Sequence, residues 1–192
     1  MVDEHAGRRR RRAAAPLSIL VVALSLVAAG CGGKSADEKA NEAYANSVCG
    51  AVATWQTQVK AIATDLSGGI SKASLQSKVT EIESQTKSLA TQIKALPPPN
   101  TSQGQATKQQ LDQLSSDLTK TVDAVKAAAD GLQADSSAAT VAVAVLTVVP
   151  EVQSLATTAK SAISSLQSSK DAMSKAFKSA DSCKSLTNNS SS

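Results

Sequence analysis

Apolar residues recur at steps of three and four positions along most of the chain after residue 35. This spacing places them on one side of an α-helix and predicts an all-α fold with almost no strand. The first two stripes are Tyr44, Val48, Val52, Trp55, Val59, Ile62, Leu66, and Leu75, Val79, Ile82, Thr86, Leu89, Ile93, Leu96. The other two are Leu111, Leu114, Leu118, Val122, Val125, Leu132, and Val152, Leu155, Ala159, Ile163, Leu166, Met173, Phe177, Ala180. The regular alternation of four and three in the second stripe is typical of coiled-coil packing.

Cap and turn residues delimit these helices. Ser35 and Glu38 have the spacing of a capping box, which marks a helix start. Glycines at residues 68–69 are expected to end the first helix, and the prolines at residues 97–99, which cannot donate amide hydrogens, form a corner. Pro150 suits the first turn of a last helix. Four amphipathic helices with short connections predict an antiparallel, coiled-coil-like four-helix bundle.

The N-terminal thirty residues differ in composition from the rest. All five arginines lie at residues 8–12, and an apolar core of about 13 residues follows at residues 17–29. That length is usual for the core of an export signal and short for a transmembrane helix, which needs about 20 apolar residues. We therefore predict an export signal.

The core ends in Ala28, Ala29, Gly30 and Cys31, which resembles the lipobox of bacterial lipoprotein signal peptides. The resemblance implies that the chain is cut between Gly30 and Cys31, and that acyl chains on Cys31 hold the protein to the extracytoplasmic face of the cell membrane. Ala28 departs from the leucine usual at that position. Secretory cleavage at the alanines, which would leave Cys31 unmodified, is the alternative. Sec and twin-arginine export both stay open.

The chain is thus divided into four segments. Residues 1–30 are a removed signal peptide, 31–34 a lipid-anchored tether, 35–187 the helical bundle domain and 188–192 a disordered tail. The body also resembles uncharacterised small helical lipoproteins of high-GC Gram-positive bacteria, through its Ala-, Ser-, Thr- and Lys-rich helices and its cysteines. That resemblance implies no particular activity.

Two cysteines remain in the exported part. Cys49 and Cys183 are expected to form a disulfide, because disulfides persist outside the cytoplasm. With an even number of alternating helices, the early Cys49 and the late Cys183 can meet between the first and last helices. Closing this loop would stabilise the fold by roughly 5 kcal/mol on the chain-entropy estimate. A metal site is not expected, since two cysteines without histidine cannot complete a tetrahedral ligand set.

Residues 138–149 depart from the pattern, because they carry no charge and are apolar on all sides. One straight helix from here to Cys183 would pass Cys49 by tens of ångströms, at about 1.5 Å per residue. We therefore expect this segment to prolong the third helix and the chain to turn at Val149 and Pro150. A strand is also possible, although it would have no partner. The segment either packs against the bundle or in a dimer, or forms a tip that touches a partner or a membrane; its candidate surface residues are Val141, Val143, Val145, Leu146 and Val149.

Composition excludes several functions. After residue 31 the chain has no histidine and no arginine, and carries only +1 of the +4 net charge. Histidine-dependent hydrolysis and di-metal bundle sites therefore have no residues to use, and nucleic acid is not expected as a partner. Trp55, one of three aromatic residues, lies on an apolar stripe and is expected in the core. No catalytic residue and no cofactor is expected.

These observations favour a non-enzymatic, lipid-anchored protein of the cell envelope. It would act as a structural spacer or a protein-interaction module, with another envelope protein or a second copy of itself as partner. The alternative is a binding or sensing module for a small apolar ligand held between the helices, with residues 138–149 as the wall of the pocket.

Overall fold

The computed structural model describes residues 33–68, 71–133 and 136–188. They form the helices α1 (Ala36–Ser67), α2 (Lys72–Ala95), α3 (Ser102–Asp130), α4 (Ala138–Ser168), α5 (Ala172–Ser179) and α6 (Asp181–Asn188), and no described residue lies in a strand. The predicted signal peptide with Gly30 and Cys31 lies outside the described residues. Of the predicted tail, Asn188 is the last residue of α6 and residues 189–192 are outside.

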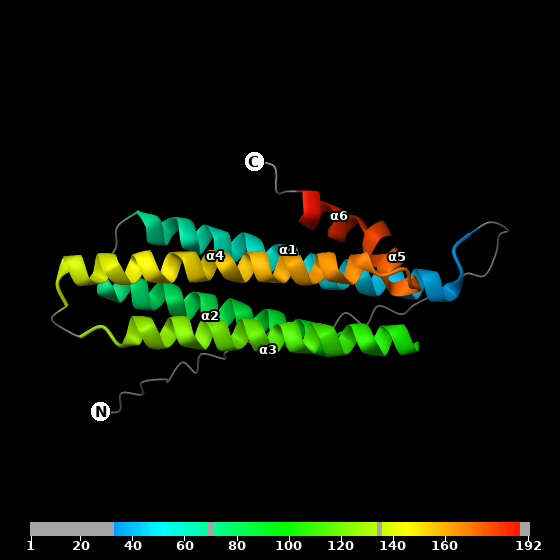
Figure 1. The fold of residues 1–192 in the computed structure, drawn as a ribbon, viewed down its shortest axis with the longest axis horizontal. Helices are drawn as coiled ribbons and strands as arrows, with labels where there is room; N and C mark the ends of the chain where they lie inside the picture. Colours follow the sequence, from blue (N-terminus) through cyan, green and yellow to red (C-terminus); the bar gives the residue numbers. More distant parts are fainter. Residues whose placement is uncertain (1–32, 69–70, 134–135, 189–192) are drawn as a thin grey trace, which may run out of the picture. The chain divides into compact units, whose positions relative to one another are not determined.

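The four long helices alternate in direction (Figure 1). α1 and α3 each pack against both α2 and α4, so the four helices form a closed ring. The two short helices α5 and α6 lie against α1 and α4. The predicted antiparallel four-helix bundle is confirmed, with two additional short helices in the C-terminal part of the chain.

The predicted apolar stripes form one continuous core. Trp55 is 2% exposed, as expected of a core residue. Its indole N–H donates to the hydroxyl of Thr86 over 3.1 Å, which gives the polar member of the second stripe a partner inside the core. At the start of α1, Ser35 and Glu38 form the predicted capping box.

The expected turn at Val149 and Pro150 is wrong, because α4 continues through both residues. Residues 138–149 therefore belong to α4 rather than to α3, and their valines are helical rather than extended. Pro150 has no N–H to donate to the carbonyl of Leu146. Both residues are on the exposed side of α4, where water can hydrogen-bond that carbonyl, while the buried Val148 and Val152 hold the inner side of the helix in the core.

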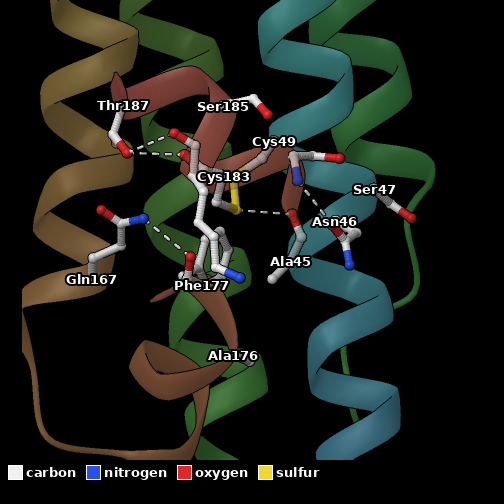
Figure 2. Close-up of a disulfide and its surroundings, with 12 residues drawn as sticks. Ala45, Asn46, Ser47, Cys49, Gln167, Ala176, Phe177, Cys183, Ser185 and Thr187 are labelled. Atoms are coloured by element: carbon white, nitrogen blue, oxygen red, sulfur yellow. Dashed lines mark hydrogen bonds between the residues drawn. A yellow bond between two sulfur atoms is a disulfide. The ribbon is translucent and has the colours of Figure 1, made fainter. Parts of the chain in front are cut away.

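The last stripe, expected to be one helix as far as Ala180, is divided instead. α4 ends at Ser168, and Asp171 caps the start of α5. The Asp171 carboxylate accepts hydrogen bonds from the Ser169 hydroxyl and the Ser174 N–H, each over 2.7 Å, and these lower the pKa of Asp171. Across the reversal, the Gln167 side chain donates to the Phe177 carbonyl over 3.0 Å (Figure 2).

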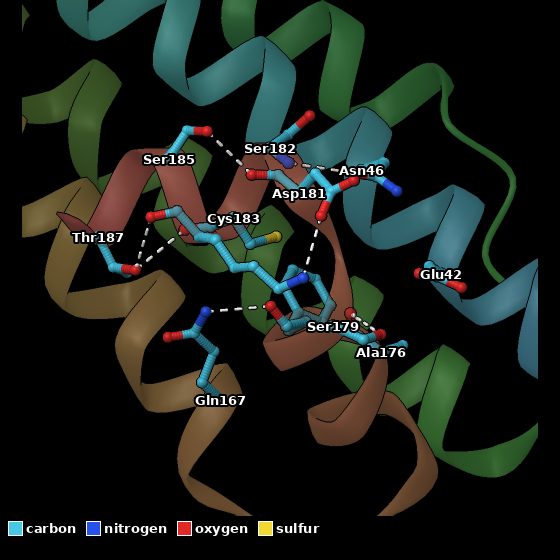
Figure 3. Close-up of polar contacts among 12 residues, drawn as sticks. Glu42, Asn46, Gln167, Ala176, Ser179, Asp181, Ser182, Cys183, Ser185 and Thr187 are labelled. Carbon is cyan, nitrogen blue, oxygen red and sulfur yellow. Dashed lines mark hydrogen bonds and ion pairs between the residues drawn. The ribbon is translucent and has the colours of Figure 1, made fainter. Parts of the chain in front are cut away.

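This reversal brings α6 back to the middle of α1. The predicted disulfide between Cys49 and Cys183 is present, with 5.0 Å between the Cα atoms and both side chains buried (Figure 2). Beside it, the backbone N–H of Ser182 donates to Oδ1 of Asn46 over 3.1 Å (Figure 3). The overshoot inferred from helix length is thus avoided by a reversal at residues 169–171 and not at Pro150.

Gly104 is fixed by a close approach in the turn before α3. The hydroxyl of Thr101 accepts from the N–H of Gly104 over 3.0 Å, and the N–H of Thr101 donates to the Pro99 carbonyl over 2.7 Å. This turn folds the Pro99 carbonyl so closely over the helix start that a Cβ at residue 104 would overlap its oxygen. Gly50, by contrast, is an α1 glycine whose added Cβ would meet only Ser182 Oγ, at 3.8 Å.

We predict opposite effects of alanine at these two glycines. Gly50→Ala should stabilise the protein by about 0.5–1 kcal/mol, because alanine restricts the unfolded chain and prefers a helix. Gly104→Ala should destabilise it despite the same preference, since the turn must open to admit the Cβ. Urea unfolding of both variants gives the two free-energy changes. A stabilising Gly104→Ala would contradict the close approach.

Candidate functional site

The outward side of α4 carries the large apolar residues that the bundle does not bury. Val143 is 63% exposed and Leu146 75% exposed, whereas Val141, two residues from Val143 on the helix, is 5% exposed. Val145 and Val149 are half-buried at the edge of the core. Of the five candidate surface residues, the structure therefore leaves two fully on the outside.

The exposed side of α4 has a regular spacing of its own. Steps of three and four residues join Val143, Leu146, Pro150, Gln153, Thr157 and Lys160, which we call the α4 outer stripe. All are exposed except Lys160, which is half-buried. Such steps place side chains in the single line that a neighbouring helix can pack against. α4 thus has two stripes, one in the core and one available to a partner.

The α4 surface also carries few charges. Glu151 and Lys160 are the two charged residues among its 31. The 29-residue α3 has seven, namely Lys108, Asp112, Asp117, Lys120, Asp123, Lys126 and Asp130. Depletion of charge, together with exposed apolar side chains, distinguishes the centre of a protein interface from ordinary surface.

By length and composition, α4 could cross a membrane, and among the described residues it is the one helix that passes this test. A core helix of a soluble protein can pass it as well. In the bundle, the inner side of α4 is packed in the core through Val152, Leu155 and Ile163, among others.

A groove of about 500 Å³ lies on the surface between α1 and α4, next to the C-terminal end of α6. We call it the α1–α4 groove; its lining is Ala53, Gln56, Thr57, Lys60, Gln153, Ala156, Thr157, Lys160, Ser185 and Leu186. The buried Gln56 closes its floor by donating from Nε2 to the Ala156 carbonyl over 2.7 Å. One lysine comes from each wall, and the lining contains no carboxylate. The groove is therefore polar and basic.

Two smaller grooves lie elsewhere on the bundle. One, between α1 and α2, has a volume of about 360 Å³ and a lining of uncharged residues that includes Asn46, Gln58, Gln85 and Gln92. The other, of about 270 Å³, lies beside Lys34 and α5. No residue of the 138–149 segment lines any of these three grooves, so the apolar-ligand alternative has no support from them.

Two buried polar atoms lack a hydrogen-bond partner among the described residues. They are the hydroxyl of Tyr44, which is 5% exposed, and Oδ1 of Asn41, one turn earlier on α1. Burial, and secondarily the negative charge of Asp112, raises the pKa of Tyr44 to about 12.

The chain was compared with known protein families, curated proteins and solved structures. No protein-family model, no curated protein and no solved structure matches the chain. Among the described residues, no group of three His, Cys, Asp or Glu side chains could hold a metal ion.

The sequence did not identify Lys60, Lys160 and Gln56 as site residues. Lys60 and Lys160 lie 100 positions apart, and each looks like an ordinary solvent-exposed lysine in its own helix. The one available signal was the α4 outer stripe, because its three–four spacing is visible in the sequence. The stronger apolar periodicity of the inner side obscures it.

Tyr44 allows a direct test of its surroundings, because it is the one tyrosine of the chain. We predict that tyrosinate absorbance at 295 nm rises with a midpoint near pH 12 in the folded protein and near pH 10 in guanidinium. Since the unfolded state loses this proton first, stability should fall as the pH rises from 10 to 12. Tyr44→Phe should remove that part of the fall. A native midpoint near 10 would show that the hydroxyl is solvated.

Proposed function

We propose that this protein is a non-enzymatic, lipid-anchored interaction module of the cell envelope, which binds a protein partner through α4. The observation that carries the proposal is the α4 outer stripe, with Val143 and Leu146 exposed on a helix almost free of charge. A soluble helix normally covers its outer side with charged residues, as α3 does. A stable bundle has no need for a leucine that is 75% exposed, so a partner supplies a reason for it.

The lipobox-like ending at Cys31 supports an anchor at the N-terminal end. Cys31 precedes Lys34 by three residues, a reach of roughly 11 Å for an extended chain. The anchor would therefore hold the start of α1 close to the membrane. α1 has 32 residues, so it is about 48 Å long, and the N-terminal end of α4 lies beside its far end (Figure 1). Val143 and Leu146 would then face a partner well away from the anchored end.

The anchor is tested by Cys31→Ser, which leaves the Cys49–Cys183 disulfide intact. We expect the unchanged protein in the membrane fraction and the variant in the soluble fraction. Mass spectrometry of the mature protein should find an acylated Cys31 as its first residue. An unmodified N-terminus at any other residue would refute lipidation without affecting the bundle.

The interaction surface is tested by a photo-crosslinking amino acid placed at Leu146 in the cells that make the protein. We expect a defined protein adduct at this position. The same residue placed at Thr91, which is exposed on α2, is the matched control and should give none. Adducts of equal yield at both positions, or none at Leu146, would contradict a partner on α4.

A further inference from the structure

We propose that the partner contributes an amphipathic helix with acidic residues in its first turn and about two turns later, which lies in the α1–α4 groove and along the α4 outer stripe. This inference rests on the proposed interaction function and adds the chemistry of the partner. Its support comes from α6, from the two groove lysines and from the order of residues along α4.

The chain already places a helix of its own between α1 and α4. Along α6, Ser182 contacts Asn46, Cys183 is bonded to Cys49, and Leu186 lines the same groove as Ala53. The partners on α1 thus advance as α6 advances, so the two helices run in the same direction (Figures 2 and 3). The α1–α4 groove begins at Ser185 and Leu186. The groove therefore continues the space between α1 and α4 that α6 occupies, and a second helix could lie there in line with α6.

The α1–α4 groove has a positive charge that favours an acidic ligand. Lys60 of α1 and Lys160 of α4 line it from opposite sides, and neither forms an ion pair with any described residue. Because α1 and α4 are antiparallel and Gln56 is bonded to Ala156, Lys160 lies toward the α6 end of the groove and Lys60 about two helical turns farther along. No acidic residue stands three or four positions from either lysine. Many other lysines do have a carboxylate partner, for example Lys126 with Asp130 at 2.6 Å. Carboxylates on the occupant would neutralise two lysines at once.

The apolar part of the occupant follows from the rest of the stripe. Leu146, Gln153 and Lys160 are spaced by seven residues and so lie in one line on α4. From Lys160 to Leu146 this line covers about 21 Å, or four helical turns. Along this line the side chains change from basic (Lys160) to polar (Gln153) to apolar (Leu146). A matching helix has acidic residues in its first turn and about two turns later, and apolar residues on the same face in the turns after that.

The direction of the bound helix follows from electrostatics at the end of α6. A helix C-terminus carries partial negative charge, and an N-terminus carries partial positive charge. The N-terminus of the occupant is therefore the end that fits next to α6. Asp and Glu are also most favourable in a first turn, which places them beside Lys160. A further carboxylate about two turns later would reach Lys60. The occupant continues along the groove in the direction of α6 and reaches Leu146 and Val143 with its later turns.

The test uses the full-length protein and a synthetic helical peptide of about 18 residues, long enough for the four turns. The peptide has Glu in its first turn and again about two turns later, and Leu at three–four spacing in the remaining turns. We expect saturable binding in fluorescence anisotropy that weakens as salt is raised. The Lys60→Glu, Lys160→Glu double variant should weaken binding by about tenfold or more. The Lys39→Glu, Lys94→Glu double variant, which reverses two charges at exposed positions of α1 and α2 outside the groove, is the matched control and should not.

A second peptide keeps the test independent of folding defects. With Lys in place of Glu, it should bind the double variant and not the unchanged protein. Such an exchange of specificity requires a folded groove in both proteins. Equal binding of the Glu and Lys peptides, or unchanged binding by the double variant, would overturn the inference.

The native partner separates this inference from the proposed function. We expect the peptide crosslinked at Leu146 to come from a helix with an acidic first turn, and the double variant to reduce its yield. A crosslink to a basic segment, to a second copy of this chain or to lipid would overturn the acidic helix. In the first two cases the interaction surface on α4 would still stand. Absence of any crosslink at Leu146 would contradict the proposed function itself.

Discussion

The position of Cys49 in the middle of α1 determines how the C-terminal part of the chain is built. α4 has 31 residues and passes the level of Cys49 on its way to the other end of the bundle. The chain must therefore reverse to bring Cys183 within the distance that a disulfide allows. The N-cap at Asp171, which accepts from the N–H of Ser174, starts α5 after that reversal, and α5 and α6 fill part of the space between α1 and α4. The unfilled part is the α1–α4 groove, so the groove is a consequence of the disulfide position.

Periodicity and cysteine arithmetic were sufficient for the architecture. The stripes, the capping box at Ser35, the corner at residues 97–99 and the Cys49–Cys183 pairing were predicted and are confirmed. The path of the chain from α3 to Cys183 was predicted wrongly, because the turn could occur at either of two places, Pro150 or residues 168–171. Proline normally disrupts a helix interior, but at Pro150 the lost hydrogen bond faces water and the buried inner side of α4 compensates. The serines and Asp171 at residues 168–171 are weaker breakers by propensity, yet the Asp171 carboxylate caps the next helix and the Ser169 hydroxyl donates to it.

The candidate site was predicted only as a segment. Residues 138–149 were recognised because they lack charge, but helical phase decides which of their side chains reach the surface. That phase is fixed by the inner stripe, which turns Val141 and Val148 into the core and leaves Val143 and Leu146 outside. The two lysines of the site could not be predicted from the sequence of a single helix, because they come from different helices. Lys60 and Lys160 line one groove only because α1 and α4 are adjacent and antiparallel in the bundle.

Helices as short as α6 are not stable on their own, since the cost of starting a helix is recovered only over many residues. α6 has eight residues, and it is held by the disulfide at Cys183, by the Ser182–Asn46 hydrogen bond and by burial of Leu186. The end of the α1–α4 groove is consequently fixed by a covalent bond and cannot spread when a ligand enters. A fixed groove reduces the ordering cost of binding, which is the main term opposing the capture of a helix by a shallow surface. The disulfide thus acts on the proposed interaction as well as on the fold, because it holds α6 in place at the end of the groove.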